Sequence, residues 1–443
     1  MIPNAIKTII LLILLTALSA CKSTEEFVIK DLIELNQNHK NYSKDIAHIN
    51  LIPAGFHKEL AKEYKSKFLA PWYLKKASIN KEKLARYFTS FANKKGFAEN
   101  KQPLEKNWIA PIKDNARIDK FPNYIKHGIT ISNTNLRLLP TTKPHFSAFT
   151  DHANGFPFDN LQNSSLAANT PILITHITKD NAWVYVETAF AQGWAPIRDI
   201  AYVDKAFKKK FKSYSKYIAA VDDDFPIKTS YGTYLFQGYI GMVFPFIKES
   251  KQYYHVAVPM ASSRRYAYIK EALIPKQSAR YAPIRATVKN IAWLSNKLTN
   301  KAYGWGGMYK NRDCSAMIRD LYTPFGIWLP RNSASQAKKG GTFITIKDLT
   351  DEQKKTFILE NAQPYFSLLW FPGHIMLYIG DEKGEPLVFH NIWGIRTNTA
   401  EKRKIIGKSV ITTLTPGKES KHVDENASFL SLLEGITLLG QRY

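Results

Sequence analysis

The sequence has two cysteines, Cys21 and Cys314, and the residues around Cys314 suggest nucleophilic chemistry. Cys314 follows Asp313, and in residues 316–322 downstream of it the apolar positions recur at helical spacing. Cys314 is therefore predicted in the first turn of a helix, with Asp313 as a natural N-cap. The helix dipole and the free N–H groups of that turn favour the thiolate, which is the form that attacks a carbonyl carbon.

Two histidines downstream of Cys314 could supply the proton transfer that a thiol nucleophile needs. His374 begins the apolar run 375–380 and is entered through Pro372-Gly373, whereas His390 ends the apolar run 386–389. A spacing of 16 residues is compatible with a hairpin, so both imidazoles could share one face opposite the helix of Cys314. One imidazole would accept and return the proton of the thiol, and the other would hold the first imidazole in the right orientation. The order Cys, His, His is that of a papain-like core.

These residues need a scaffold, and the chain of 443 residues is long enough for two to four compact units. Hydrophobic residues make up 44% and charged residues 22%, which is close to ordinary globular usage and indicates neither a disordered chain nor a multi-span membrane protein. Residues 21–124 predict short helices and loops that wrap other units. Residues 125–205 and 226–276 predict two small β-barrels from closely spaced strands. Residues 280–443 predict an α+β unit, with helices first and strands after.

The first twenty residues predict an export signal, because Lys7 precedes a short apolar run at 9–15. Residues 18–21, Leu-Ser-Ala-Cys, resemble the bacterial lipobox, so residues 1–20 would be a signal peptide and Cys21 the lipidated first residue of the mature protein. The alternatives are an ordinary cleaved signal and an uncleaved anchor. Lipidation would leave Cys314 as a lone free thiol.

The formal net charge of +25 favours polyanions or anionic surfaces. In an exported lipoprotein these would be lipid head groups or wall polymers, and nucleic acid is not expected as a partner. A solvated basic surface is the alternative, since the lysines are spread along the chain.

Several motifs together resemble the NlpC-type family of bacterial cell-wall cysteine peptidases. They are Tyr303-Gly304-Trp305-Gly306-Gly307, Asp313-Cys314-Ser315, Leu329-Pro330-Arg331 with Ser333 and Gln336, and Pro372-Gly373-His374. The domain order is similar to that of its subgroup of γ-D-glutamyl-L-diamino acid endopeptidases, which are like dipeptidyl-peptidase VI. The resemblance implies a multidomain α+β fold in which an N-terminal helical segment and two SH3-like β-barrels precede a papain-like peptidase domain.

The resemblance also implies roles for individual residues. Cys314 would be the nucleophile, His374 the general base and acid, and His390 the group that orients His374. Asp313 and Ser315 would bind the free amino group of an N-terminal L-Ala. The remaining candidates are Tyr303 beside the nucleophile, Glu187 of the first barrel toward the substrate amine, and Arg331 toward a substrate carboxylate, with a salt bridge holding its loop as the favoured alternative.

The implied reaction is hydrolysis of the bond between γ-D-Glu and the diamino acid in peptidoglycan stem peptides, without a cofactor. The alternatives are a general wall endopeptidase or amidase of the same fold, and a catalytically inactive peptidoglycan-binding lipoprotein. No metal is expected, and the run Asp222-Asp223-Asp224 is interpreted as a solvated linker. The expected location is the periplasmic side of the cell envelope, with a lipid anchor at Cys21 in the outer membrane rather than the inner membrane.

Overall fold

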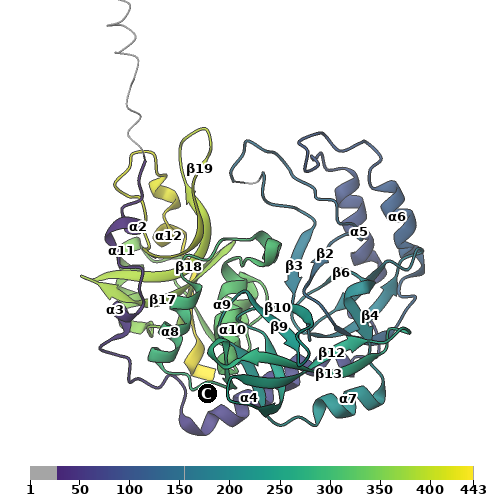
Figure 1. Cartoon of the computed structure of the whole chain (residues 1–443). Helices are drawn as coiled ribbons and strands as arrows, with labels where there is room; N and C mark the ends of the chain where they lie inside the picture. The colour runs from purple at the N-terminus through teal and green to yellow at the C-terminus, as the bar shows by residue number, and fades with distance from the viewer. Residues whose placement is uncertain (1–26, 154, 443) are drawn as a thin grey trace, which may run out of the picture.

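The computed structural model of the chain describes residues 27–153 and 155–442, so the predicted signal peptide and Cys21 lie outside the described residues. Figure 1 shows a C-terminal unit, in green to yellow, on one side and a first sheet, in blue to teal, on the other. A second sheet lies below and between them. None of the helices in these two ranges is long and apolar enough to cross a membrane.

The N-terminal segment runs along all three units rather than forming a core of its own (Figure 1). Leu51, Ile52 and Leu60 are buried in the core of the C-terminal unit. Further along, Phe88 and Phe91 are buried against the first sheet. Its helices and 3₁₀ turns are α2 (Asp31–Glu34), α3 (Lys40–Ser43), η1 (Ala54–Phe56), α4 (His57–Leu69), η2 (Ala70–Tyr73), α5 (Lys81–Ala92), α6 (Ala110–Ala116) and η3 (Ile118–Lys120).

The first sheet has seven antiparallel strands in the order β3-β2-β6-β5-β4-β1-β7. The strands are β1 (Lys126–Thr130), β2 (Thr134–Arg137), β3 (Gln162–Leu166), β4 (Pro171–Ile177), β5 (Trp183–Glu187), β6 (Gln192–Pro196) and β7 (Ile200–Tyr202), with the turn η4 (Ile197–Asp199). The apolar pattern predicts β4 well, because its residues are buried almost throughout. It does not predict β3, whose sequence Gln-Asn-Ser-Ser-Leu is mostly polar.

The second sheet also has seven strands, in the order β10-β9-β13-β12-β11-β8-β14. The elements are α7 (Lys205–Lys212), β8 (Tyr217–Ala220), β9 (Phe225–Thr229), β10 (Tyr234–Gly238), β11 (Val243–Glu249), β12 (Tyr253–Ala261), β13 (Ala267–Pro275), η5 (Lys276–Ser278) and β14 (Ala279–Ala282). The expected range 226–276 is too narrow, because β8 and β14 pair with each other outside it. These two short strands lack the longer apolar runs that mark β11 and β12.

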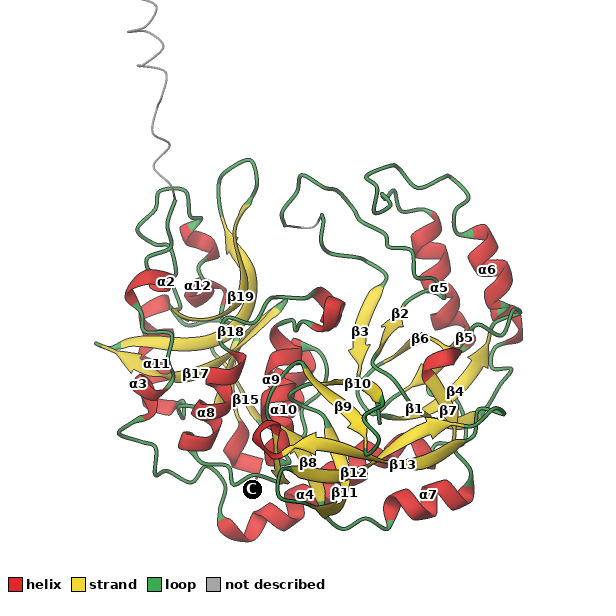
Figure 2. Cartoon of the chain, in the orientation of Figure 1, coloured by secondary structure: helices red, strands yellow, loops and turns green. Residues whose placement is uncertain are grey.

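The C-terminal unit places helices against one mixed-length antiparallel sheet in the order β15-β20-β16-β17-β18-β19 (Figure 2). Its elements are α8 (Val288–Leu298), η6 (Trp305–Lys310), α9 (Cys314–Tyr322), η7 (Thr323–Phe325), α10 (Ser333–Gly340), β15 (Thr342–Thr345), α11 (Asp351–Asn361), β16 (Ser367–Phe371), β17 (His374–Glu382), β18 (Glu385–Arg396), β19 (Arg403–Thr413), η8 (Glu425–Ala427), α12 (Phe429–Leu432), β20 (Gly435–Leu438) and η9 (Leu439–Arg442). Apolar residues of α8 and α9 share one buried core with Ile375, Leu377 and Ile379 of β17.

Two local features set the positions of the chemical groups. The Asp313 carboxylate accepts the backbone N–H of Ala316 at 2.8 Å, so α9 starts at Cys314. A two-residue turn joins β16 to β17, because Phe371 pairs directly with His374. Gly373 in that turn has φ +96°, a value that L-residues with a side chain rarely adopt. His374 is therefore held at the first position of β17.

Candidate active site

The Cys314 thiol lies at the N-terminus of α9 and faces the beginning of β17. Its sulfur accepts a hydrogen bond from the backbone N–H of Ile375, the residue after His374. Cys314 and His374 are 7% and 8% exposed, so both groups are almost completely covered by protein. The structure thus brings the predicted nucleophile to the strand that carries the predicted base.

His374 and His390 are also brought together, as the hairpin-compatible spacing predicts. His374 Nε2 lies 2.8 Å from His390 Nδ1, and His390 Nε2 lies 3.0 Å from Thr412 Oγ1. The Thr412 hydroxyl donates to the carbonyl of Thr413 at 2.8 Å. Thr412 Oγ1 therefore accepts from His390 Nε2–H, which leaves His390 Nδ1 as an acceptor for His374 Nε2–H. This assignment leaves His374 Nδ1 as the basic nitrogen.

Phe429 covers this histidine pair. Its ring centroid lies 6.0 Å from that of His374 and 5.4 Å from that of His390. Burial lowers the pKa of His374 to about 3, an effect to which Arg403 adds and which Asp313 opposes. Burial also lowers the pKa of His390 well below its usual value, and His374 adds to that effect. Both imidazoles are therefore neutral near pH 7.

The Cys314 thiol is neutral as well, which corrects the expectation of a thiolate. Burial, with the negative charge of Asp313 beside it, raises the pKa of Cys314 to about 12. The N–H groups of Ile375 and Ser315 and the charge of Arg331 lower it, but by less. In this position desolvation outweighs the two N–H groups and the charge of Arg331. The resting pair is therefore a thiol and a neutral imidazole, and His374 can act as a general base.

Asp313, Ser315 and Arg331 form one buried network beside the thiol. Arg331 donates to both carboxylate oxygens of Asp313, at 3.0 and 2.6 Å, and to the Ser315 hydroxyl at 3.0 Å. Its Nε donates to the hydroxyl of Ser164 on β3 at 2.8 Å. Burial acts to raise the pKa of Asp313, but the charge and hydrogen bonds of Arg331 hold it below its usual value. Arg331 thus makes the salt bridge that was the favoured alternative for this residue, and it ties the first sheet to α9.

Tyr303 lies in an aromatic wall next to these groups. Burial raises the pKa of Tyr303 well above its usual value, and the charges of Cys314 and Asp313 add to the rise. The ring of Trp393 lies 6.0 Å from Tyr303, and Phe158 of the first unit lies 6.4 Å from Tyr303 and 5.3 Å from Trp305. This wall provides flat apolar surfaces beside a polar site, as ligand pockets commonly do.

Glu187 does not join the site. It is 3% exposed on β5, and its two carboxylate oxygens accept the backbone N–H of Ser78 at 2.9 and 3.1 Å. Its interaction therefore fastens the N-terminal segment to the first sheet. The assignment of Glu187 to the substrate amine is corrected accordingly, because its acceptors face the N-terminal segment.

The first unit reaches the site through β3 instead. The Gln162 amide donates to the carbonyl of Gly306 at 3.0 Å. A Cβ on Gly307, whose φ is +81°, would lie 2.3 Å from the Ser165 hydroxyl oxygen. These contacts, with that of Ser164, were not found from the sequence, since β3 is polar and distant in the chain. Thr412 was missed as well, because a single threonine in a strand carries no local signal.

The aspartate run 222–224 also needs a correction. Asp223 is not solvated: its side chain is 3% exposed and accepts two hydrogen bonds from Arg312, at 2.8 and 2.9 Å. Arg312 also donates to Asp320 at 2.8 Å. This pair joins the second sheet to the loop that precedes Cys314. Among residues 27–153 and 155–442 there is no group of three His, Cys, Asp or Glu side chains that could hold a metal ion.

Four stretches of the sequence match protein-family models. Residues 8–121 match the NLPC_P60 stabilising domain, N term. Residues 144–196 match the SH3 domain of SH3b1 type, and residues 204–251 match the SH3 domain of SH3b2 type. Residues 300–403 match the NlpC/P60 family. The predicted architecture of two SH3-like domains before an NlpC-type domain is therefore confirmed. No match was found among curated proteins.

One solved structure has the same architecture over most of the chain. The chain is 25% identical to an NlpC/P60 endopeptidase from Photobacterium damselae subsp. piscicida, with a TM-score of 0.82 over 92% of this chain and 98% of that chain. It is 14% identical to an NlpC/P60 family protein from Bacillus cereus ATCC 10987, with a TM-score of 0.48 over 70% of this chain and 99% of that chain. The chain belongs to the NlpC/P60 family, and it is a peptidase of that family.

Proposed function

We propose that this peptidase hydrolyses the bond between γ-D-Glu and the diamino acid in peptidoglycan peptides that have a free N-terminal L-Ala. The observation that carries the catalytic part is the chain of contacts from Thr412 through His390 to His374, at the strand that faces the Cys314 thiol. It leaves a basic nitrogen on His374 for the proton of the thiol.

In the first half of the reaction, Cys314 Sγ attacks the γ-carbonyl carbon of D-Glu, and His374 Nδ1 takes the thiol proton. The carbonyl π electrons move to its oxygen, where N–H groups at the start of α9 stabilise the negative charge. His374 then gives its proton to the nitrogen of the diamino acid. The C–N bond breaks, and the thioester of L-Ala-γ-D-Glu with Cys314 remains.

In the second half, water attacks the thioester carbon and His374 takes a proton from the water. The C–S bond breaks, His374 returns the proton to the sulfur, and L-Ala-γ-D-Glu leaves with a new carboxyl group. His374 gains positive charge in both halves. His390 accepts a hydrogen bond from its other nitrogen, which stabilises the orientation of the ring throughout.

The free amino group of the substrate is assigned to Asp313. Its Oδ2 accepts from Arg331, whereas Oδ1 accepts from Arg331, Ser315 and Ala316, so Oδ2 has capacity for a further donor. A cationic amine there would be attracted to the carboxylate, whose negative form Arg331 maintains. An N-acylated peptide lacks the positive charge and would leave that interaction unmade.

The test compares L-Ala-γ-D-Glu-diaminopimelate with its N-acetyl derivative, using the full chain and Cys314→Ala in detergent, with products identified by mass spectrometry. Release of L-Ala-γ-D-Glu from the free peptide alone, lost in Cys314→Ala, is the expected result. Equal cleavage of both peptides would point to a general wall endopeptidase. No cleavage of either peptide would contradict the proposed activity and favour a peptidoglycan-binding role.

We further propose that the chain is anchored by a lipid on Cys21 and faces the periplasm, in the outer membrane. The support is the sequence at residues 18–21, in which small residues precede the cysteine. Metabolic labelling with an alkyne fatty acid tests this proposal. Incorporation into the wild-type chain but not into Cys21→Ser is expected, and equal labelling of both would overturn it. Membrane fractionation would then test the outer membrane.

A further inference from the structure

One surface of the molecule carries many lysines and no carboxylate of its own. It consists of residues 205–216, which include α7, and of residues 73–76 at the end of η2. We name it the α7 face. Six of its lysines are exposed, and Lys208 and Lys212 are half-buried. The two stretches contain no aspartate or glutamate and eight lysines, which are Lys75, Lys76, Lys205, Lys208, Lys209, Lys210, Lys212 and Lys216.

Contacts beneath the lysines hold the two stretches of the α7 face together. Phe207 and Phe211 of α7 are buried, and their ring centroids lie 6.2 and 5.3 Å from that of Trp72. At the surface, Lys212 Nζ lies 3.9 Å from the centroid of the Tyr73 ring. The apolar side of α7 is therefore occupied by the core, and its lysine side is left toward solvent.

The positive charges of the α7 face are not balanced by the fold. In the part of the chain that the structure describes, no carboxylate lies within ion-pair distance of any of its eight lysines. Lys208 Nζ donates instead to Nδ1 of His127, at 2.7 Å. Burial lowers the pKa of Lys208, and the charge of Lys212 lowers it further. Cations this close repel one another, so an anionic partner would relieve a repulsion that the fold leaves in place.

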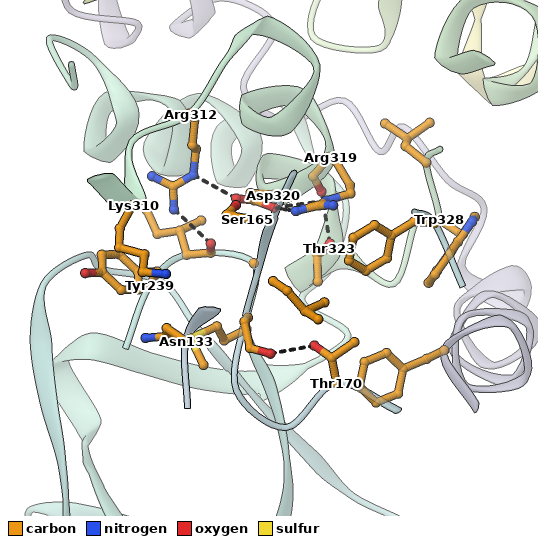
Figure 3. A pocket seen from close by; sticks show the side chains of 18 of the residues that line it. Asn133, Ser165, Thr170, Tyr239, Lys310, Arg312, Arg319, Asp320, Thr323 and Trp328 are labelled. Atoms are coloured by element: carbon orange, nitrogen blue, oxygen red, sulfur yellow. Dashed lines mark hydrogen bonds and ion pairs between the residues drawn. The ribbon is translucent and has the colours of Figure 1, made fainter. Parts of the chain in front are cut away.

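Cations at the junction of the units are balanced by carboxylates, in contrast to those of the α7 face. Figure 3 shows Arg312 and Arg319 beside Asp320, to which they donate at 2.8 and 3.0 Å. Arg312 also donates to Asp223. These arginines therefore need no partner from outside the chain. The lysines of the α7 face remain as part of the net charge of +25 that is available to an anionic partner.

The position of the α7 face distinguishes between the anionic surfaces of the cell envelope. Figure 1 shows α7 at the opposite end of the molecule from α2, which lies close to the first described residue, Phe27. Cys21 precedes Phe27 by six residues, which can span at most about 22 Å. With the proposed lipid on Cys21, the end that carries α2 lies next to the anchoring membrane. The α7 face is then on the side away from that membrane.

We propose that the α7 face binds the intact peptidoglycan polymer through the free carboxylates of its stem peptides. A glutamate that is linked through its γ-carbonyl keeps its α-carboxylate, so the polymer presents negative charge at every stem peptide. Exposed ammonium groups on flexible stems attract such charges without one fixed geometry. Several weak pairs formed at once hold a polymer more tightly than one pair holds a free peptide. The inference rests on the proposed function, from which it takes the wall peptide and the lipid anchor.

The experiment sediments the full Cys314→Ala chain, in detergent, with purified peptidoglycan sacculi. A second sample uses sacculi whose carboxylates have been converted to amides. The chain is expected to sediment with the untreated sacculi and to lose most of that binding on amidation. Because Cys314→Ala cannot form a thioester, the result does not depend on cleavage. Failure of the proposed peptidase activity and failure of this binding are therefore observed separately.

Two triple variants locate the binding on the surface. The first replaces exposed lysines of the α7 face, Lys205→Gln, Lys209→Gln and Lys210→Gln. The control removes the same charge from exposed lysines of α5 and the segment after it, Lys81→Gln, Lys83→Gln and Lys106→Gln. The first variant is expected to bind sacculi about tenfold more weakly, because three exposed charge pairs are lost. The control should bind as the unsubstituted chain does.

Equal affinities of the two triple variants would overturn the proposal, and so would equal binding to untreated and amidated sacculi. Absence of sedimentation would mean that the lysines form a solvated surface alone. A second membrane is the other possible occupant. It is tested with the chain anchored in phosphatidylcholine vesicles and mixed with phosphatidylglycerol vesicles. Vesicle clustering that the α7 substitutions abolish, without binding to sacculi, would assign the face to a membrane and contradict the proposal.

Discussion

His374 Nε2 lies 2.8 Å from His390 Nδ1, and the direction of the proton between them is set by a third residue, Thr412. The Thr412 hydroxyl donates its hydrogen to the carbonyl of Thr413, so toward His390 it can act only as an acceptor. A chain of three neutral groups therefore holds the lone pair of His374 on Nδ1. This arrangement explains how a buried histidine pair without a carboxylate can keep one base in the correct tautomer.

Thr412→Val tests this chain of hydrogen bonds. The variant keeps the shape of the side chain but leaves the buried His390 Nε2–H without an acceptor, so the other tautomer of His390 becomes competitive. We expect kcat to fall about tenfold to hundredfold, the equivalent of about 1–3 kcal/mol for an unsatisfied buried donor, with KM little changed. Thr412→Ser keeps the hydroxyl and should restore most of kcat. An unchanged kcat in Thr412→Val would rule out a tautomer-fixing role.

The buried histidines also predict how stability depends on pH. The folded-state pKa of His374, about 3, lies below its ordinary value of 6.5, and that of His390 is also lowered. The stability they contribute is complete above pH 6.5 and is lost as the pH falls toward 3, because the unfolded chain binds the protons first. His374 should contribute about 1.4 kcal/mol per pH unit in that window, and His390, whose pKa is lowered too, should act in the same direction.

Melting temperatures between pH 7 and pH 4 check this expectation. The wild-type chain should lose stability more steeply than His390→Asn, which has one fewer histidine to protonate on unfolding. His48→Asn is the control, since His48 is exposed. Equal pH slopes for the wild-type chain and His390→Asn would show that His390 does not stay neutral in the folded protein.

The sequence predicted the parts of the site that share a local pattern. Cys314 after Asp313 has the signature of a helix start, and the apolar runs next to His374 and His390 have the signature of a hairpin. Both signals come from residues that are close together in the chain. The structure agrees, with α9 beginning at Cys314 and β17 paired with β18.

The sequence did not predict contacts between units. β3 was missed because its inner residues bond to Arg331 and Gly306 of another unit, so they are polar where a core strand would be apolar. The buried state of Asp223 was missed because its partner, Arg312, lies 89 residues away. The expectation of a thiolate was wrong because it considered only the start of the helix. The burial of the Cys314 thiol, which raises its pKa, depends on contacts that the local sequence does not show.

Gly307→Ala tests whether the first SH3-like unit supports the catalytic loop. Gly307 has φ +81°, and an added Cβ would lie 2.3 Å from Ser165 Oγ. Gly232 has a similar φ of +84° but nothing within 4 Å of an added Cβ, so Gly232→Ala measures the backbone strain by itself. We expect Gly232→Ala to cost about 1–2 kcal/mol and Gly307→Ala to cost more and to lower kcat. Equal losses of stability with unchanged kcat would mean that this contact is dispensable.

Asp223→Asn tests the link between the second SH3-like unit and the loop before Cys314. The Arg312 side chain is 7% exposed, and in the variant its charge would be balanced by Asp320 alone. Removing one partner of a buried pair is strongly destabilising, so the free energy of unfolding should fall by about 3 kcal/mol. Asp222→Asn is the matched control. Asp222 pairs with Lys297 at 3.3 Å, but both side chains are more than a third exposed.

The control should therefore change stability by about 0.5 kcal/mol or less. Urea unfolding followed by tryptophan fluorescence gives both values, and the peptidase assay gives the effect on turnover. Because Arg312 also holds the carbonyl of Ile240, a loosened Arg312 should release the turn of the second sheet from the loop that leads into α9. The loss of stability is then expected together with a lower kcat. Equal stabilities of Asp223→Asn and Asp222→Asn would show that the second unit docks independently of this ion pair.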